Sequence, residues 1–390
     1  MLCEEIRMNK KYTIDSLLDR SIINTSTRIF DIAYKKGAKK IIFAMTPDTA
    51  HSTTLDFCEK AGNNVPLMWL LQHMLDYTDP ILETTVMGIP FSNPFGISAG
   101  LDKNCQITKV ADAAGYGFET VGSTTARPCD GNPRPWFHRL PEYESMMVHV
   151  GLANKGSERI MQEVEKAYTR SRQMKISVSL ARTNDRFVGD DEEGIEDYMI
   201  SLQRAADKSD LIEINISCPN TMVGERFVTP DMLDRLLTGL DRIQHKQPLM
   251  VKLPQDKEWN ELKDLLDVIC EHNVQGVTIA NLRKDRSGLS IPSEWKGNLS
   301  GRPCETKANS LIEQTYREYG TRLAIAGVGG VSTAEQAYWK IRHGSSLVML
   351  VSALIYQGPQ VMTQIRQGVA ELLRRDGFKH ISDAVGVDVQ

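Results

Sequence analysis

The chain has 390 residues, a formal net charge of −4 and a charged fraction of 25%. This length fits one α/β barrel or two average domains, and the lack of a basic excess disfavours nucleic acid as a partner, so a small-molecule ligand is expected. The seven cysteines show no CxxC spacing and no apolar run reaches the ~18 residues of a transmembrane helix, so we expect a reducing, cytoplasmic setting without disulfides or a metal site.

The N-terminal part of the chain is expected to precede the main domain. Residues 1–38 carry no pattern that predicts a function, and we treat them as an extension with partial disorder. Residues 39–60 and 65–75 are expected to be helical, and the apolar residues of 65–75 form a broad helical face.

Eight short apolar runs follow, and amphipathic segments alternate with them. The runs are 95–99, 118–122, 176–180, 211–216, 249–253, 276–280, 323–327 and 347–351. The helical segments include 229–244, which opens with Thr229 and Pro230, and 332–344, with Ser332 as N-cap and Gly344 as its stop.

Strict alternation of strand and helix predicts parallel pairing through crossover helices. Eight repeats of this unit predict a (β/α)8 TIM barrel, with an open doubly wound sheet as the structural alternative. The chain then divides into an extension (1–38), a small N-terminal helical region (39–80) and a barrel domain (81–390).

Polar and small residues lie just after these runs, where α/β barrels carry their active sites. Lys103 follows the first run, Cys218 the fourth and Asn281 the sixth. The GVGG sequence at 327–330 and Ser352 follow the seventh and eighth, where such barrels bind phosphate through backbone amides. The sequence therefore predicts a phosphate-bearing ligand.

Each of these features also has a purely structural interpretation. Cys218 can be an inert buried residue, and Asn215 and Asn220 can be turn residues beside it. Lys252 differs, because an ammonium group inside an apolar strand is costly to bury without an anionic partner. We therefore expect Lys252 to be a functional residue with an anionic partner.

Together, seven segments resemble a known enzyme family. They are FSNPFGISAGLDKN (91–104), GNPRP (131–135), NISCPNT (215–221), VKLP (251–254), NLSGRP (298–303), GVGGV (327–331) and ALIYQGP (353–359). Their order and spacing resemble the dihydroorotate dehydrogenases, FMN-dependent barrel enzymes of pyrimidine biosynthesis, over roughly residues 80–375. The resemblance implies that FMN oxidises dihydroorotate to orotate.

The resemblance also implies a role for each matching residue. Cys218 would be the base that takes a proton while hydride passes to the flavin, and Lys103 would lie beside flavin and substrate. The implied substrate contacts are Lys103, Asn215, Asn220, Thr221 and Asn281. The implied FMN contacts are Ala99, Gly100, Ser123 and Lys252 at the ring system, and Gly301, Gly330 and Ser352 at the ribityl chain and phosphate.

Three positions depart from the family pattern. Val148 stands where an Asn is usual, Leu282 where Thr or Ser is usual, and Ser179 where quinone-using members carry Asn. Two substrate hydrogen bonds would therefore be missing, at a cost of ~1 kcal/mol or more each. The alternatives are a related FMN oxidoreductase for another cyclic amide or conjugated carbonyl compound, and a scaffold without catalysis.

The electron acceptor is left open between quinone and fumarate. Residues 39–60, with Pro47, Ala50 and His51, resemble the opening helix of membrane-associated, quinone-using members, where a helical pair builds an apolar tunnel. Helices that only cap the barrel are the alternative. A cysteine base is typical of soluble members that use fumarate or NAD. Peripheral contact with the inner face of a membrane and homodimer formation are further expectations.

Overall fold

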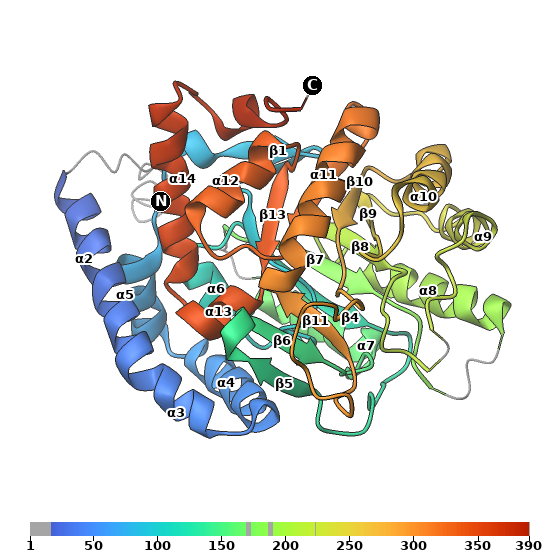
Figure 1. The fold of residues 1–390 in the computed structure, drawn as a ribbon, viewed down its shortest axis with the longest axis horizontal. Coiled ribbons are helices and arrows are strands. Elements are labelled where there is room, and N and C mark those ends of the chain that lie inside the picture. The colour runs from blue at the N-terminus through green and yellow to red at the C-terminus, as the bar shows by residue number, and fades with distance from the viewer. Residues whose placement is uncertain (1–16, 169–172, 186–189, 223, 390) are drawn as a thin grey trace, which may run out of the picture.

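The computed structural model describes residues 17–168, 173–185, 190–222 and 224–389. Its centre is a closed barrel of parallel strands (Figure 1). In spatial order the strands are β10 (Gly276–Ile279), β12 (Ala324–Val328), β13 (Leu347–Leu350), β3 (Phe95–Ile97), β4 (Phe118–Thr124), β7 (Lys175–Leu180), β8 (Leu211–Asn215) and β9 (Leu249–Lys252). Pairing of β9 with β10 closes the ring. The eight predicted strands and the TIM barrel are confirmed, and the open sheet is wrong.

Amphipathic helices cover the outside of the barrel. They are α6 (Thr108–Ala113), α7 (Ser157–Ala167), α8 (Asp191–Ala205), α9 (Pro230–Leu240), α10 (Trp259–Glu271), α11 (Glu305–Tyr319), α12 (Ala334–Arg342), α13 (Ser352–Gln357) and α14 (Val361–Arg375). On α9, Leu233, Leu236, Leu237 and Leu240 follow helical spacing and are at most 1% exposed, so this face packs on the sheet.

Two helix ends differ from the prediction in detail. Helix α9 follows Thr229 as predicted but ends at Leu240 rather than at residue 244. Thr333, not Ser332, caps α12, because the Thr333 side chain accepts a hydrogen bond from the Gln336 N–H at 3.3 Å. Ser332 instead donates from its hydroxyl to the Gln336 side chain. Gly344, with φ of 113°, follows the end of α12 as expected.

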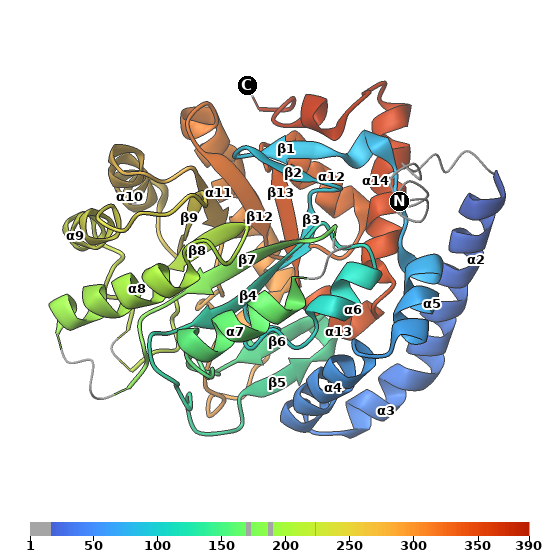
Figure 2. The same ribbon diagram turned by 180° about the vertical axis from the view of Figure 1, so that it is seen from behind.

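Short antiparallel sheets lie at opposite ends of the barrel (Figure 2). The hairpin β1 (Thr84–Val86) and β2 (Ile89–Phe91) covers one end, and its turn uses positive φ at Met87 and Gly88. At the other end, β5 (Phe137–Leu140), β6 (Ser145–Val148) and β11 (Asn298–Gly301) form a sheet beside the mouth of the barrel.

The N-terminal helices form a layer along one side of the barrel, beside α13 and α14 (Figure 1). They are α2 (Leu17–Ala33), a π-helical segment (Tyr34–Ala38), α3 (Lys39–Ala44), α4 (Pro47–Ala61) and α5 (Val65–Leu75). Residues 65–75 match the predicted helix, whereas 39–60 divide into α3 and α4 at Thr46, which caps α4. Residues 17–38 continue directly into α3, and residues 1–16 lie outside the described residues.

A buried arginine fastens this layer to the barrel. Arg366 of α14 is 0% exposed, and its guanidinium donates to the carbonyls of Leu75 at 2.8 Å and Ala114 at 2.7 Å. It also pairs with Asp76 at 3.2 Å. One side chain thereby satisfies carbonyls at the ends of α5 and α6, which fixes the helical layer relative to the barrel wall.

Candidate active site

One large cavity, of about 880 Å³, opens at the carboxyl ends of the barrel strands and continues between the N-terminal helices. Every predicted site residue except Thr221 lines it. These residues are Ala99, Gly100, Lys103, Ser123, Asn215, Cys218, Asn220, Lys252, Asn281, Gly301, Gly330 and Ser352. The fold thus brings together residues that are up to 253 positions apart in the sequence, from Ala99 to Ser352.

The Cys218 thiol and the Lys103 ammonium influence each other at the centre of this cavity. Burial raises the pKa of Cys218 above its ordinary value, while the Asn220 backbone N–H, Lys103 and Lys252 act to lower it. Burial lowers the pKa of Lys103 to about 8, partly offset by Cys218. The Lys103 Nζ donates to the Gly100 carbonyl at 2.7 Å, which holds the lysine at the strand end. The positive charge of Lys103 therefore favours the thiolate form of Cys218.

The asparagines near Cys218 form a connected network. Asn281 Nδ2 donates to Asn215 Oδ1 at 3.1 Å and to the Ser217 carbonyl at 2.7 Å. Asn215 Nδ2 donates to Ser123 Oγ at 2.8 Å, and Ser123 bonds Ser179 Oγ at 2.8 Å. These contacts fix the orientation of each amide, so the donors and acceptors left for a ligand have defined directions.

Lys252 has an anionic partner within the protein. Its Nζ lies 3.9 Å from Glu213 Oε1, with side chains 6% and 2% exposed, and 3.4 Å from Ser98 Oγ. The other Glu213 oxygen accepts a hydrogen bond from Thr278 at 2.7 Å. The sequence predicts a partner for Lys252 but not its identity, because the β8–β9 register that brings the two together is a long-range feature.

Glycines at the end of β11 and just after β12 leave the backbone there without a side chain. Gly301 has φ of 85°, and a Cβ there would lie 2.5 Å from the Glu144 carbonyl. Gly330 has φ of 77°, and a Cβ would lie 2.4 Å from Glu305 Cβ. Ser300 and Ser352, whose Oγ atoms are 2.8 Å apart, add hydroxyls on the same wall. Hydroxyls and side-chain-free backbone fit the expected phosphate-bearing ligand.

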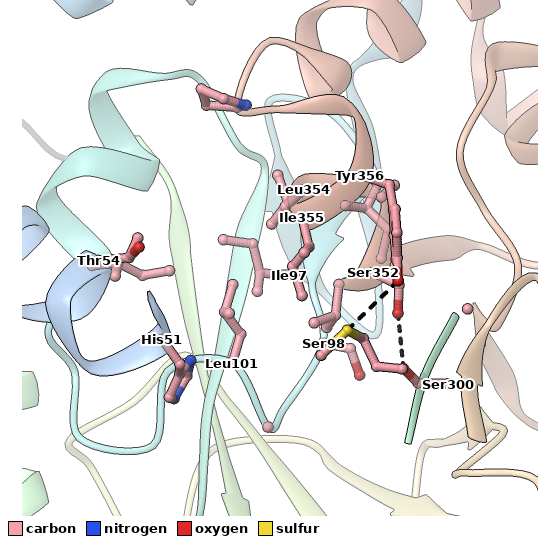
Figure 3. A pocket seen from close by; sticks show the side chains of 18 of the residues that line it. His51, Thr54, Ile97, Ser98, Leu101, Ser300, Ser352, Leu354, Ile355 and Tyr356 are labelled. Atoms are coloured by element: carbon pink, nitrogen blue, oxygen red, sulfur yellow. Dashed lines mark hydrogen bonds between the residues drawn. The ribbon is translucent and has the colours of Figure 1, made fainter. Parts of the chain in front are cut away.

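The outer part of the cavity is apolar and lies between the N-terminal helices. Its lining includes Phe30, Ile42, Leu67, Leu71 and Met74. In Figure 3, His51 and Thr54 of α4 face Ile97 and Leu101, with Ser300, Ser352 and Tyr356 on the other side. Burial lowers the pKa of His51 to about 4, so the imidazole is neutral at pH 7 and adds no charge to this wall.

The structure adds a junction that the sequence does not reveal. Tyr34 Oη donates to the Ile355 carbonyl at 2.6 Å, and Lys39 Nζ to the Tyr356 carbonyl at 2.7 Å. Arg139 of β5 donates to the carbonyls of Ile42 at 3.0 Å and Met45 at 2.8 Å. These contacts seal the helical layer against α13 and β5. The acceptors are backbone carbonyls, so no residue pattern could have indicated them.

Thr221 lies apart from the main cavity. It lines a second space of about 20 Å³ that also touches Cys218 and Asn215. Its hydroxyl donates to the Gly224 carbonyl at 2.8 Å. This second space is large enough for one water molecule.

Comparisons with known proteins agree on one family. The family model described as dihydroorotate dehydrogenase matches residues 81–373. The "Dihydroorotate dehydrogenase (quinone)" of Synechocystis sp. is 34% identical over 82% of this chain and 86% of its own length. That of Parvibaculum lavamentivorans is 34% identical over 90% and 98%. A crystal structure of DHODH from Eimeria tenella in complex with ferulenol matches with a TM-score of 0.77 and 26% identity, over 88% of this chain and 96% of that one.

Proposed function

The chain belongs to the dihydroorotate dehydrogenase family, and from this premise we propose that it oxidises dihydroorotate with bound FMN, Cys218 as base and a quinone as acceptor. Membership makes it a flavin-dependent oxidoreductase that acts on a CH–CH group. The observation that carries the proposal is the single cavity, which joins Cys218, Lys103 and the asparagines to an apolar passage between the N-terminal helices.

Cys218 is the proposed proton acceptor. The Cys218 Sγ thiolate takes a proton from one ring carbon. The electron pair of that broken C–H bond then forms the new double bond to the neighbouring ring carbon. When bound, the flavin accepts the hydride that leaves the neighbouring carbon. Because burial raises the pKa of Cys218, the thiol must lose its proton before each turnover, and Lys103 favours the thiolate.

Asparagine side chains suit an orotate-like ring. Asn215, Asn220 and Asn281 border the same cavity as Cys218, and a carboxamide presents both a donor and an acceptor to a cyclic imide. Asn281 donates to Asn215, and Asn220 is held by Asn298 and the Val148 carbonyl, so all three amides are in place before the substrate arrives. The free energy of ordering them is therefore not lost on binding.

The FMN site would lie along the wall from β3 to β13. Ala99, Gly100, Ser123 and Lys252 would contact the ring system, and the cradle at Gly301 and Gly330 with Ser352 would receive the ribityl chain and phosphate. The positive φ values of these glycines and the close approach of Glu144 and Glu305 exclude a side chain at both positions, so the backbone that borders the cavity there stays uncovered.

The small space beside Thr221 would provide a route by which the proton taken up by Cys218 reaches solvent. One water between Cys218 and Thr221 would take the proton from the thiol and pass it toward the surface, where Arg226 also borders this space. Thr221, whose hydroxyl donates to the Gly224 carbonyl and can accept a hydrogen bond, would then position this water rather than contact the substrate directly.

The quinone assignment rests on the apolar outer passage. Fumarate is a small dianion and would gain nothing from a wall of Phe30, Leu67, Leu71 and Met74, whereas a lipophilic quinone would bury apolar surface there. Within the described ranges, no helix is both long and apolar enough to cross a bilayer.

A membrane surface could deliver such a quinone. Exposed apolar side chains gather on the N-terminal helices, among them Ile41 at 64%, Val65 at 78% and Trp69 at 59% exposed. We infer that this face rests on a lipid surface, with Lys35 and Lys36 able to meet anionic headgroups. Co-sedimentation with anionic vesicles tests this, and loss of binding in Trp69→Glu with Val65→Glu is the expected result.

An anaerobic titration tests the reaction itself. The purified protein should contain FMN, and adding dihydroorotate should bleach its visible absorbance, since the substrate delivers two electrons. A flavin that stays oxidised at saturating dihydroorotate would contradict the proposal. Release and identification of the extracted flavin check the cofactor separately.

A second candidate substrate is a different cyclic amide or conjugated carbonyl compound. Val148 and Leu282 favour it, because both apolar side chains border the cavity beside Asn220 and Asn281. If this candidate is correct, Val148→Asn with Leu282→Thr should create or raise dihydroorotate-dependent bleaching. No gain in the double variant, against a fully active parent, would exclude it.

A further inference from the structure

The first residue of the NLSGRP segment has no role in the function proposed above. Asn298 begins β11, and in the β6–β11 ladder it lies directly opposite Val148. Val148 is also paired with Phe137 of β5, so one cross-strand row contains all three residues. Side chains in such a row project from the same face of an antiparallel sheet.

That face of the sheet is the one turned to the cavity. Phe137 and Val148 border the cavity, as do Arg139, Met146 and Ser300, which lie two positions along each strand. The alternate residues Met147 and Leu299 instead pack in a separate apolar cluster on the other face. Asn298 is therefore the polar member of a row whose other two members, Val148 and Phe137, are apolar and border the cavity.

Asn298 holds the side chain of Asn220. Its Nδ2 donates to Asn220 Oδ1 at 2.8 Å, while Asn220 Nδ2 donates to the Val148 carbonyl at 3.0 Å. A main-chain carbonyl can only accept, so the Asn220 nitrogen must face β6 and its oxygen must face Asn298. The Asn220 amide is thus fixed at both ends by neighbouring strands.

This arrangement determines what Asn220 can offer to a ligand. Asn220 lines the cavity, and one of its two N–H groups remains after the bond to Val148. Val148 and Leu282 supply no side-chain hydrogen bond nearby. Polar selection on this part of the wall therefore depends on Asn220 and, through it, on Asn298.

We propose that Asn298 is a positioning residue that orients the Asn220 carboxamide as a donor toward a ring carbonyl oxygen of the substrate. This inference rests on the proposed function, because it concerns how the same site recognises an orotate-like ring. Asn298 acts through Asn220 and does not itself touch the substrate. The selectivity of the enzyme for the substrate ring then depends on Asn298, the cross-strand partner of Val148.

The test is calorimetric titration of orotate into the flavin-loaded protein and into Asn298→Leu. Leucine has a similar size but cannot donate a hydrogen bond, so Kd should rise about fivefold to tenfold, the loss of one neutral hydrogen bond. Asn298→Ser should weaken binding similarly because its hydroxyl is too short to reach Asn220, and it covers the case in which the leucine variant fails to fold. His138→Leu, on the opposite face of the same sheet, is the matched control and should bind as the parent does.

Two monothio analogues of orotate, each with one ring carbonyl oxygen replaced by sulfur, separate positioning from loosening of the sheet. Sulfur is a weaker acceptor, so the parent should bind one analogue less well than orotate, and the Asn298 variants should lose that preference. A sheet that had merely loosened would weaken all three ligands equally. Orotate binding within twofold of the parent in both Asn298 variants would overturn the inference alone, whereas a parent that binds no orotate would overturn the proposed function with it.

Discussion

The inner end of the cavity is lined by polar, hydrogen-bonded residues, whereas its outer end is lined by apolar side chains. At the inner end, Asn215, Asn281 and Lys252 are held by hydrogen bonds and an ion pair among buried groups. At the outer end, side chains such as Leu67 and Met74 contribute apolar surface without directional contacts. Directional contacts fix geometry to a fraction of an ångström, whereas apolar surface tolerates changes of shape. Changes at the two ends should therefore affect different half-reactions.

The largest effect is expected at the inner end, from Cys218→Ala. Removing a general base typically slows the proton-transfer step by about 10²-fold to 10⁴-fold, so flavin reduction by dihydroorotate should fall by that factor. The flavin content should stay normal. Anaerobic stopped-flow absorbance measures this rate directly, and reduction as fast as in the parent would remove Cys218 from the base position.

Lys252→Met should destabilise the inner end by breaking a buried ion pair. It leaves the Glu213 carboxylate buried without its cation, which typically costs ~3–5 kcal/mol of unfolding free energy and should also reduce flavin retention. The double variant Lys252→Met with Glu213→Gln removes the unpaired charge and should recover much of the stability. Denaturant titration distinguishes the two, and a single variant as stable as the parent would show that the pair contributes little.

A change at the outer end should leave flavin reduction intact. Ala50 of α4 is 5% exposed and borders the apolar passage, so Ala50→Phe should narrow it and slow reoxidation by a quinone about tenfold. Dihydroorotate should still bleach the flavin at the parental rate. The control Asp56→Phe adds the same ring on the exposed side of the same helix. Equal slowing of both half-reactions in Ala50→Phe would contradict the separation of the two ends.

The smallest expected effect is a pH dependence of flavin reduction. The active form needs a Cys218 thiolate and a charged Lys103. Burial raises the pKa of Cys218 above its ordinary value and lowers the pKa of Lys103 to about 8. The rate should rise above pH 7 and reach a maximum above pH 8 before declining. Lys103→Arg keeps its charge at every accessible pH, so its profile should rise to a plateau without the decline. A flat profile in the parent would mean that neither group titrates in this step.

The same contrast explains what the sequence could predict. The barrel strands are recognisable because their apolar runs, such as 211–216 and 249–253, are local patterns, and side chains just after them must meet at one edge of a parallel sheet. Lys103, Cys218 and Asn281 could therefore be placed together from local patterns and the family resemblance. The helix Val65–Leu75 can also be predicted from a local pattern, because its apolar residues follow helical spacing.

Side-chain partners could not be predicted, because they depend on register and on long-range packing. Glu213 meets Lys252 only through the β8–β9 ladder, and Asn298 reaches Asn220 only because β11 pairs with β6. The family resemblance places Thr221 with the substrate, but no residue pattern predicts that its hydroxyl donates to the Gly224 carbonyl. The sequence does not predict helix α2, because its apolar residues pack against α5, which becomes its neighbour only in the folded chain.

The most direct test of the two-ended cavity is a double-mixing experiment without oxygen. The protein is first reduced with one equivalent of dihydroorotate and then mixed with a lipophilic quinone or with fumarate, while flavin absorbance reports reoxidation. We predict rapid return of the oxidised spectrum with quinone, slow return with fumarate, and slowing of the quinone reaction alone in Ala50→Phe. Faster reoxidation by fumarate than by quinone, unchanged in Ala50→Phe, would contradict the account.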